Sequence, residues 1–233
     1  MLERKKEMSF NIAIDGPAGA GKSTIAKMVA KELGFVYVDT GAMYRAISLY
    51  LLRNDILATD IEQIESVLDD INITIEYENG TQIVMLNGEN VNPYIRTEKV
   101  GVMTSAVSMH SVVRDKLLEL QRKLASSADV LMDGRDIGTC VLPDAQLKIF
   151  LTASSKTRAT RRWKELQERG IECSIEQIEK DIIERDNQDM TRETAPLKQA
   201  EDAVLVDTSD MTILQVVNHI IQLTKQVQDR KKC

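Results

Sequence analysis

The stretch Gly16-Pro17-Ala18-Gly19-Ala20-Gly21-Lys22-Ser23-Thr24 is the most informative part of this chain. It matches the pattern G-x-x-x-x-G-K-[ST], whose glycines let backbone N–H groups approach a phosphate while the lysine reaches the outer oxygens. Residues 10–14 form a short apolar run typical of a buried strand. The apolar residues after the loop recur at helical spacing: Ile25, Met28, Val29 and Leu33. A strand, a glycine-rich loop and a helix in this order predict a nucleoside triphosphate site at a helix N-terminus.

Composition restricts the class of protein. The chain has 233 residues, of which 43% are hydrophobic and 28% charged, as expected for one globular domain with room for an insert. A net charge of −6 leaves no basic surface for a nucleic-acid polymer. The three cysteines are odd in number and widely spaced, which indicates neither a disulfide framework nor a zinc site. The charged first residues and the absence of a long apolar run predict a cytoplasmic protein without a membrane segment.

Short apolar runs, most of them ending in an acid, recur along the chain. They cover residues 11–15, 35–39, 130–133, 147–151 and 203–207, and helical patterns separate most of them. Repeated strand–helix units predict a parallel sheet with helices on both faces and ligands at the carboxyl ends of the strands. We therefore expect an α/β P-loop NTPase three-layer fold with a central parallel five-stranded sheet. The last helical pattern, 212–227, has one apolar face made of Ile213, Val216, Val217, Ile220 and Val227.

One segment interrupts this alternation. Residues 71–77 alternate apolar and polar side chains, Asn79-Gly80 follows, and residues 81–86 lead to a second turn at Asn87-Gly88. Asn-Gly between alternating segments is a strong hairpin signal, so an antiparallel meander is expected roughly between residues 65 and 98. It is interpreted as an insert that contacts substrate near the crevice; the alternative is a decoration at the edge of the sheet.

The positions of the arginines favour phosphoryl transfer. Arg45 follows the second predicted strand, and Arg135 with Asp136 follows the strand at 130–133, so all three are expected at strand ends. Arg185, Asp189 and Arg192 are spaced to share one helical face if the helix persists. Guanidinium groups that converge on phosphoryl groups stabilise the charge of such a transition state. Five further basic residues share one predicted helix: Arg158, Arg161, Arg162, Lys164 and Arg169. Lys164 and Arg169 are expected on its solvated face.

Four motifs in order resemble those of the bacterial-type cytidylate kinases. They are Asp15-Gly-Pro-Ala-Gly-Ala-Gly-Lys-Ser, Asp39-Thr-Gly-Ala-Met-Tyr-Arg45, Asp133-Gly-Arg-Asp-Ile-Gly-Thr139 and Glu184-Arg-Asp-Asn-Gln-Asp-Met-Thr-Arg192. The resemblance covers the chain from about residue 10 to the final helix. It implies ATP-dependent phosphorylation of CMP and dCMP by a monomer, part of pyrimidine nucleotide metabolism. It also implies three parts: a P-loop core (9–64, 99–153 and 193–228), an insert that binds the monophosphate (65–98) and a helical lid (154–192), with flexible ends at 1–8 and 229–233.

The resemblance also assigns roles to individual residues. Residues 16–24, here called the phosphate loop, bind ATP, and Thr40 stands where the family usually has serine at a substrate contact. The residues that match the readers of the cytosine ring are Ser105, Arg114 and Asp136. Those that match the acceptor-phosphate site are Arg45, Arg135 and Arg192, while Arg185 and Asp189 match the sugar contacts. Arg158, Arg161 and Arg162 fall in the lid. Arg162 is expected to act on the transferred phosphoryl group. The expected catalytic residues are Lys22, Arg135, Arg162 and Arg192.

The chemistry of these side chains agrees with a cytosine nucleotide. The carboxylate of Asp136 can accept from the C4 amine, and Arg114 can donate to the ring acceptors. Uracil carries an acceptor at C4 and would leave Asp136 unpaired. For Mg²⁺, Ser23 is the expected ligand and Asp133 the acid that holds a metal-bound water, with Asp15 as the alternative.

Other functions remain open at this level. A P-loop kinase acting on UMP, AMP or a non-nucleotide acceptor is the nearest alternative. A nucleotide-operated switch is another, although the chain has no N-K-x-D run for reading guanine. We also expect the three lid arginines to lie away from the nucleotide site when no nucleotide is bound, because their mutual repulsion and hydration favour an open lid.

Overall fold

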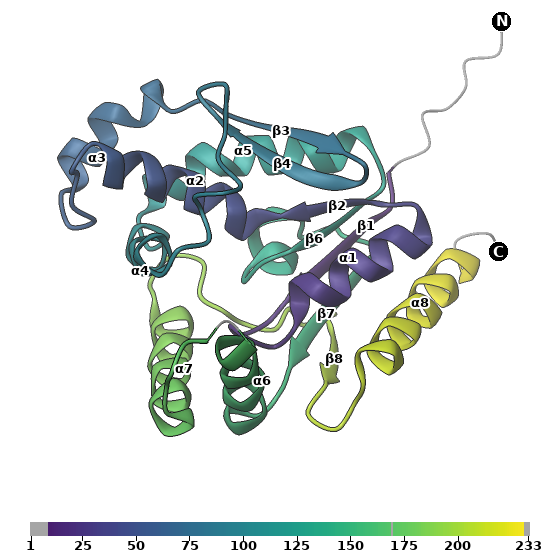
Figure 1. The fold of residues 1–233 in the computed structure, drawn as a ribbon. Helices are drawn as coiled ribbons and strands as arrows, with labels where there is room; N and C mark the ends of the chain where they lie inside the picture. The colour runs from purple at the N-terminus through teal and green to yellow at the C-terminus, as the bar shows by residue number, and fades with distance from the viewer. Residues whose placement is uncertain (1–8, 169, 231–233) are drawn as a thin grey trace, which may run out of the picture.

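A five-stranded parallel sheet forms the centre of the molecule (Figure 1), and the computed structural model describes residues 9–168 and 170–230. The strand order is β2-β6-β1-β7-β8. The strands are β1 (Asn11–Asp15), β2 (Val36–Asp39), β6 (Val130–Asp133), β7 (Leu147–Thr152) and β8 (Val204–Asp207). All five predicted strands are confirmed within one or two residues. Because every pairing is parallel, the acids at the strand ends and the phosphate loop after β1 lie at the same edge.

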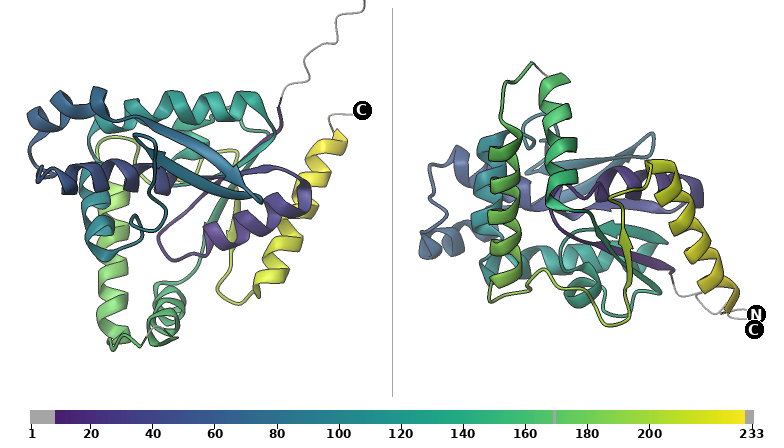
Figure 2. Two further views of the ribbon diagram at one scale, coloured as in Figure 1. Left: turned by 45° about the horizontal axis from the view of Figure 1, so that its top comes forward. Right: turned by 90° about the horizontal axis from the view of Figure 1, so that it is seen from below.

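Helices cover both faces of the sheet, and side chains of β1 alternate between two apolar clusters. Ile12 and Ile14 belong to the cluster that α1 (Lys22–Leu33) and α8 (Ile213–Arg230) complete. These two helices lie side by side (Figure 2). Ala13 points to the other cluster, which α2 (Thr40–Arg53), α4 (Glu98–Val107) and α5 (Ser111–Ser127) complete. This burial on both faces confirms the three-layer arrangement.

The predicted meander is confirmed. After α3 (Ile61–Val67) and a 3₁₀ turn (Leu68–Asp70), a three-stranded antiparallel sheet forms from β3 (Ile73–Glu78), β4 (Thr81–Leu86) and β5 (Glu89–Asn90). Both Asn-Gly turns have positive φ, 50° and 74° at Asn79-Gly80, as two-residue hairpin loops require. Buried Ile73, Val84 and Leu86 join the same apolar cluster as α2, so the insert extends the main core.

The insert also contacts the free edge of β2. The side chain of Gln82 accepts a hydrogen bond from the backbone N–H of Asp39 (2.7 Å) and donates one to the carbonyl of Asp39 (3.2 Å). Tyr77 donates to the carbonyl of Tyr37 (3.1 Å). Side chains of the insert thus satisfy backbone groups that an edge strand otherwise exposes.

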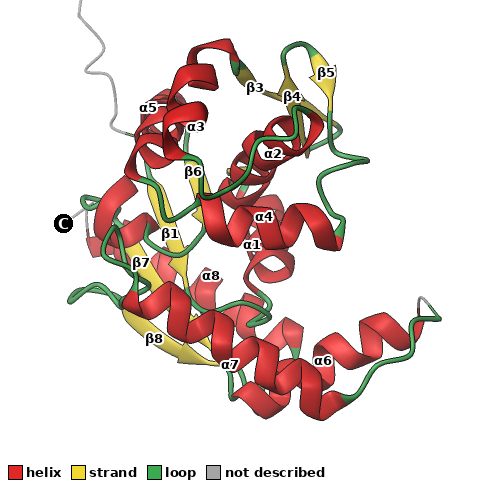
Figure 3. Cartoon of the chain, turned by 90° about the vertical axis from the view of Figure 1, so that its left-hand side faces the viewer, coloured by secondary structure: helices red, strands yellow, loops and turns green. Residues whose placement is uncertain are grey.

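Two helices project from the core beside the phosphate loop. α6 (Ser155–Glu168) and α7 (Ile175–Thr191) pack against each other (Figure 3). Lys164 is exposed as expected, whereas Arg169 lies outside the described residues. Between β6 and β7, residues Ile137–Val141 form a single helical turn, labelled η2.

The helix ends differ in part from what was expected. Ile213, which begins α8, is 52% exposed, whereas Val216, Val217 and Ile220 of the predicted face are buried. Residues 229–230, expected in a flexible end, continue α8, while 1–8 and 231–233 lie outside the described residues. α7 ends at Thr191, and Arg192 follows it with extended backbone, so Arg192 does not share the helical face of Arg185 and Asp189. No helix in the described part of the chain has the length and apolarity needed to cross a membrane.

The shared core makes a prediction about the insert. Truncation of Leu86, which is 3% exposed, removes apolar contacts between the hairpin and α2, so Leu86→Ala is expected to lower the free energy of unfolding by about 2–5 kcal/mol. The measurement is urea unfolding followed by circular dichroism. Leu57→Ala is the matched control: Leu57 is 69% exposed, and its change is expected to stay within about 0.5 kcal/mol. Equal effects of the two substitutions would show that the insert does not share the core.

Candidate active site

The phosphate loop is shaped by a close approach of backbone to β7. Gly16 has a φ of 147°, and a Cβ at this position would lie 1.9 Å from the carbonyl oxygen of Leu151. Only glycine fits there, since a backbone oxygen cannot move aside as a side chain can. The loop then turns into α1 at Gly21, and the free N–H groups of the first helical turn face the end of the sheet.

Lys22 lies inside this loop. It is 6% exposed, and its ammonium donates to the carbonyl oxygens of Gly16 (2.7 Å) and Pro17 (2.7 Å). Burial lowers the pKa of Lys22 well below its ordinary value, and the charge of Arg135 lowers it further, while Asp133 and Asp15 raise it. Backbone carbonyls are weak partners for a buried cation, so the ammonium is suited to exchange them for phosphate oxygens.

Ser23 and Asp133 supply oxygen ligands of the kind that Mg²⁺ prefers. The Ser23 hydroxyl donates to Oδ2 of Asp133 at 2.9 Å. Burial and the nearby charge of Asp39 raise the pKa of Asp133 to about 6, while Lys22 and hydrogen bonds from Tyr37 and Ser23 lower it, so the carboxylate is ionised at neutral pH. A hydroxyl and a buried carboxylate next to the phosphate loop fit a hard divalent cation bound partly through water.

Asp15, the alternative acid for the metal, has a different role. Its two carboxylate oxygens accept the backbone N–H groups of Ile137 (2.8 Å) and Gly138 (2.7 Å), in the turn η2. Burial raises the pKa of Asp15 to about 6 although these hydrogen bonds lower it. Asp15 therefore joins the end of β1 to the turn that carries Asp136, and the structure favours Asp133 at the metal.

Alternating arginines and aspartates line the site next to the loop. Asp136 forms an ion pair with Arg114 and lies 3.6 Å from Arg192. Asp189 lies 3.8 Å from Arg192 and accepts a hydrogen bond from Arg135 at 2.9 Å. The order Arg114–Asp136–Arg192–Asp189–Arg135 brings together predicted site residues from α5, the loop after β6 and the end of α7.

Two members of this chain of ion pairs, Asp189 and Arg114, have charges that their partners stabilise, whereas burial and the charge of Arg114 lower the pKa of Arg192. Burial raises the pKa of Asp189, but the charge and the hydrogen bond of Arg135 outweigh it, so the pKa lies below its ordinary value. Burial likewise opposes the charge of Arg114, and Asp136 outweighs it. Asp189 and Arg114 are therefore held in their charged forms by their partners.

Two further predicted arginines lie close to this chain. Burial lowers the pKa of Arg45, and the charges of Arg96 and Arg135 lower it further. Burial also lowers the pKa of Arg185, with Arg135 and Arg45 adding to the effect. The Nε of Arg185 is buried and has no hydrogen-bond partner among the described residues. Cations that repel one another at close quarters are suited to binding a polyanion.

The structure places the remaining predicted contacts as follows. Thr40 begins α2 and donates from its hydroxyl to the carbonyl of Asp133 at 2.8 Å, so the hydroxyl reinforces the strand end. Ser105 lies half-buried on α4. Its backbone carbonyl accepts a hydrogen bond from the Ser108 hydroxyl, and the backbone carbonyl of Ser108 accepts one from the Arg114 guanidinium. Both residues lie next to the site, but the structure shows them bonded to neighbouring protein groups.

The lid arginines differ from what was expected. Arg162, the predicted catalytic lid arginine, forms an ion pair with Glu165 on its own helix. Arg161 donates to Thr208 beyond β8. Arg158, expected to lie away from the loop, is 5% exposed and donates to the carbonyl of Ala18 in the phosphate loop at 2.9 Å. It is therefore Arg158 that connects α6 to the phosphate loop, while Arg161 is bonded near β8 and Arg162 is exposed.

Several residues at the site escaped the sequence reasoning. Asp186 pairs with Arg158 across α6 and α7 at 2.6 Å, and Arg96 from the insert pairs with Asp39 at 2.8 Å. Tyr37 donates to Asp133 at 2.7 Å. Asp186 precedes Asp189 by one helical turn, which is a usable signal, whereas nothing in the local sequence marks Arg96 or Tyr37 as partners of distant acids.

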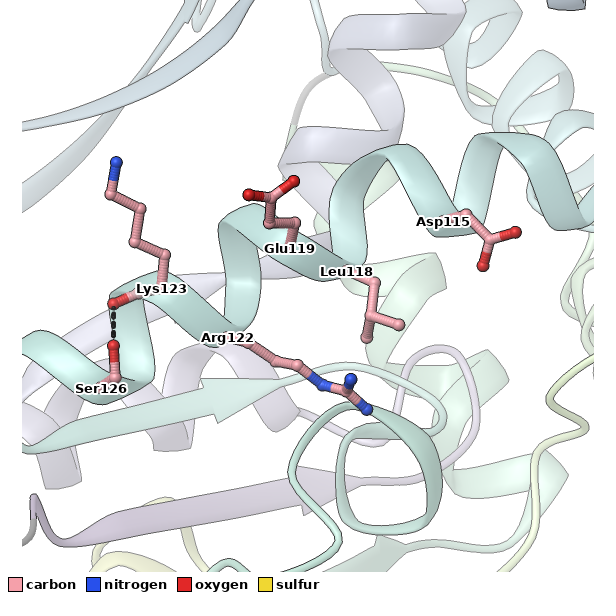
Figure 4. A pocket seen from close by; sticks show the side chains of 6 residues that line it. All are labelled: Asp115, Leu118, Glu119, Arg122, Lys123 and Ser126. Carbon is pink, nitrogen blue, oxygen red and sulfur yellow. Dashed lines mark hydrogen bonds between the residues drawn. The ribbon is translucent and has the colours of Figure 1, made fainter.

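A separate hollow runs along α5 and contains none of the predicted site residues (Figure 4). Along it, Arg122 reaches the carbonyls of Cys140 and Val141, and the Ser126 hydroxyl donates to the carbonyl of Lys123. A hollow at the site itself includes Arg192, bordered by Met109 and the end of α7. We place the functional site at the latter because the convergent charges lie there.

The chain is similar over most of its length to known proteins. A family model described as cytidylate kinase matches residues 12–226. A protein of Caldicellulosiruptor saccharolyticus named cytidylate kinase is 51% identical over 218 residues, which cover 94% of this chain and 96% of that protein. A cytidylate kinase of Lactobacillus johnsonii is 46% identical, with 97% and 99% covered. A gluconokinase from Sinorhizobium meliloti shares the fold alone, with a TM-score of 0.50 and 12% identity over 97% of this chain and 98% of that one.

The geometry of Asp15 yields a prediction that separates it from the metal site. Asp15→Ala leaves two buried N–H groups without acceptors, so it is expected to lower the free energy of unfolding by about 2–4 kcal/mol. Asp15→Asn retains one acceptor, so its free energy of unfolding is expected to lie between those of Asp15→Ala and the wild type. Urea unfolding measures both. Unchanged stability together with a loss of Mg²⁺-dependent nucleotide binding would identify Asp15 as the metal acid instead.

Proposed function

The chain belongs to the cytidylate kinase family, and we propose that it transfers the γ-phosphoryl group of ATP to CMP and dCMP, in the presence of Mg²⁺. The observation that carries the proposal is the chain of ion pairs Arg114–Asp136–Arg192–Asp189–Arg135 beside the phosphate loop. It offers alternating donors and acceptors of the kind that a nucleoside monophosphate needs, next to a loop built for a triphosphate.

ATP would bind along the phosphate loop. Backbone N–H groups of the loop and of the first turn of α1 would donate to the phosphates, and Lys22 would exchange the carbonyls of Gly16 and Pro17 for phosphate oxygens. Ser23 and Asp133 would hold the magnesium ion, which would neutralise negative charge on the phosphates during transfer. Asp133 is ionised for this role at neutral pH, since its pKa is raised only to about 6.

The acceptor base would be read by Asp136 and Arg114. Both are buried and each already fixes the other, so the carboxylate and guanidinium are held rigidly before substrate arrives. Cytosine matches them with an amine for Asp136 and acceptors for Arg114. Ser105 lies on the neighbouring helix α4 and is proposed as a further contact to the base.

The acceptor phosphate would lie among Arg45, Arg135 and Arg192, and the sugar against Arg185 and Asp189. Burial is the main cause that lowers the pKa of Arg45 and Arg185, and a phosphate bound among them would relieve the repulsion between arginines that lowers it further. Positioned cations, rather than a protein nucleophile, are what phosphoryl transfer requires. We propose that the insert (65–98) serves this acceptor side and the lid (154–192) the ATP side.

For the lid we propose Arg158 in place of Arg162 as the arginine that acts at the loop. Arg158 already contacts Ala18 and is oriented by Asp186, whereas Arg162 is bonded to Glu165. A short rearrangement of Arg158 would place its charge against the transferred phosphoryl. The monomeric state, the cytoplasmic location and the absence of nucleic-acid or membrane partners stay predictions of the sequence.

The choice of acceptor tests the function. CMP and dCMP are expected to be phosphorylated well, UMP more slowly and AMP poorly, because losing one buried polar match costs about 1–3 kcal/mol. The measurement is ADP formation with each monophosphate in turn. AMP as the best acceptor would contradict the assignment of Asp136 and Arg114, and ADP release indifferent to every monophosphate would indicate a nucleotide-operated switch.

The sugar contact has its own test. Asp189→Ala is expected to weaken binding of both CMP and dCMP, because the 3′-hydroxyl is common to both and Arg135 loses its partner as well. Removal of a carboxylate from a charged hydrogen bond costs about 1.5–3 kcal/mol, which appears as a raised KM for each acceptor. A loss confined to CMP would mean that only the 2′-hydroxyl is read. Equal KM values in variant and wild type would remove Asp189 from the sugar site.

A further inference from the structure

Both oxygens of the Asp133 carboxylate accept a hydrogen bond in this structure. Oδ2 accepts from the Ser23 hydroxyl at 2.9 Å, and Oδ1 accepts from the phenol of Tyr37 at 2.7 Å. Ser23 belongs to the phosphate loop, whereas Tyr37 belongs to none of the motifs from which the site was predicted. The carboxylate proposed to hold magnesium thus has a second donor that comes from a different strand.

The position of Tyr37 brings its hydroxyl to the metal site. Tyr37 lies on β2, which pairs with β6 so that Asp39 is opposite Asp133. The ring of Tyr37 is packed in the apolar cluster with α1, and the residue is 6% exposed. Burial and the charge of Asp133 hold the pKa of Tyr37 above its ordinary value, so the phenol remains a proton donor at physiological pH.

Tyr37 is also held from its other side. Its backbone carbonyl accepts a hydrogen bond from Tyr77 of the insert at 3.1 Å, and the ammonium of Lys27 lies 5.6 Å from the centre of its ring. A tyrosine with so many contacts has little freedom to leave the carboxylate. The bond to Oδ1 is therefore a persistent feature of the folded chain.

We propose that Tyr37 is a positioning residue for magnesium: its hydroxyl holds the Asp133 carboxylate in the orientation that receives the cation of MgATP. This inference rests on the proposed function. A carboxylate turns about its Cβ–Cγ bond unless hydrogen bonds fix its plane. Ser23 is itself expected to ligate the ion, so Tyr37 is the donor whose bond to Asp133 does not depend on the ligand. Groups that orient metal ligands in this way typically contribute about 10–100-fold to metal affinity.

The test uses binding of a non-hydrolysable ATP analogue, measured calorimetrically with saturating Mg²⁺ and again with EDTA. The dissociation constant in EDTA divided by that with Mg²⁺ reports how strongly the cation supports nucleotide binding. Tyr37→Phe keeps the ring and removes only the hydroxyl. It is expected to reduce this ratio roughly ten-fold, with the affinity in EDTA unchanged. A structural role alone would lower the denaturant midpoint and leave the ratio as in the wild type, which would overturn the proposal.

Tyr77→Phe is the matched control, because it removes a phenol hydroxyl one contact further from Asp133. The ratio of dissociation constants for Tyr77→Phe is expected to equal that of the wild type. An equal decrease of the ratio in both variants would overturn the positioning role of the Tyr37 hydroxyl. If Tyr37→Phe does not fold, Tyr37→Met, which fills a similar volume without a donor, carries the same expectation. Failure of the wild-type chain to bind the analogue in either condition would instead contradict the proposed function itself.

Discussion

Asp133 carries a buried negative charge where β6, β2 and the first turn of α1 meet, and the surrounding structure is arranged to stabilise it. Removing a carboxylate from water costs several kcal/mol unless hydrogen bonds and an opposite charge offset the loss. Here Tyr37 and Ser23 donate to its oxygens, and the charge of Lys22 favours the ionised form. All of these partners are available only because parallel strands end at one edge of the sheet.

The same principle governs the two other buried charges of the phosphate loop. Asp15 accepts two backbone N–H groups of η2, and Lys22 donates to two loop carbonyls. Asp15 is fully bonded within the protein, so it fixes η2 against the end of β1. Lys22 is bonded to groups that phosphate oxygens can replace, so it is prepared for a ligand. Two residues of the same motif therefore differ in role because of the partners that the fold provides.

On the proposed acceptor side, the arginines are already paired with aspartates before a substrate binds. Each arginine in the chain from Arg114 to Arg135 already contacts an aspartate, which keeps the group folded despite its positive charge. A monophosphate gains by adding to this network where Arg45 and Arg185 are still poorly paired. The insert contributes by holding the edge of β2, from whose end α2 and Arg45 follow. The lid contributes through Arg158, which reaches the loop itself.

The sequence by itself determined the parallel sheet, the phosphate-loop motif and the meander, because these follow from local periodicity, glycine spacing and turn chemistry. Asp15 and Asp133 both end apolar strands, and only the structure shows that they differ in their partners: Asp15 accepts from Ile137 and Gly138, and Asp133 accepts from Ser23. Arg158 and Arg162 are one helical turn apart, so their spacing alone could not tell which one α6 turns toward the loop. The end of α7 before Arg192 and the bond of Tyr37 to Asp133 were likewise decided by tertiary structure, because a helix end and a buried hydroxyl depend on partners contributed by distant segments.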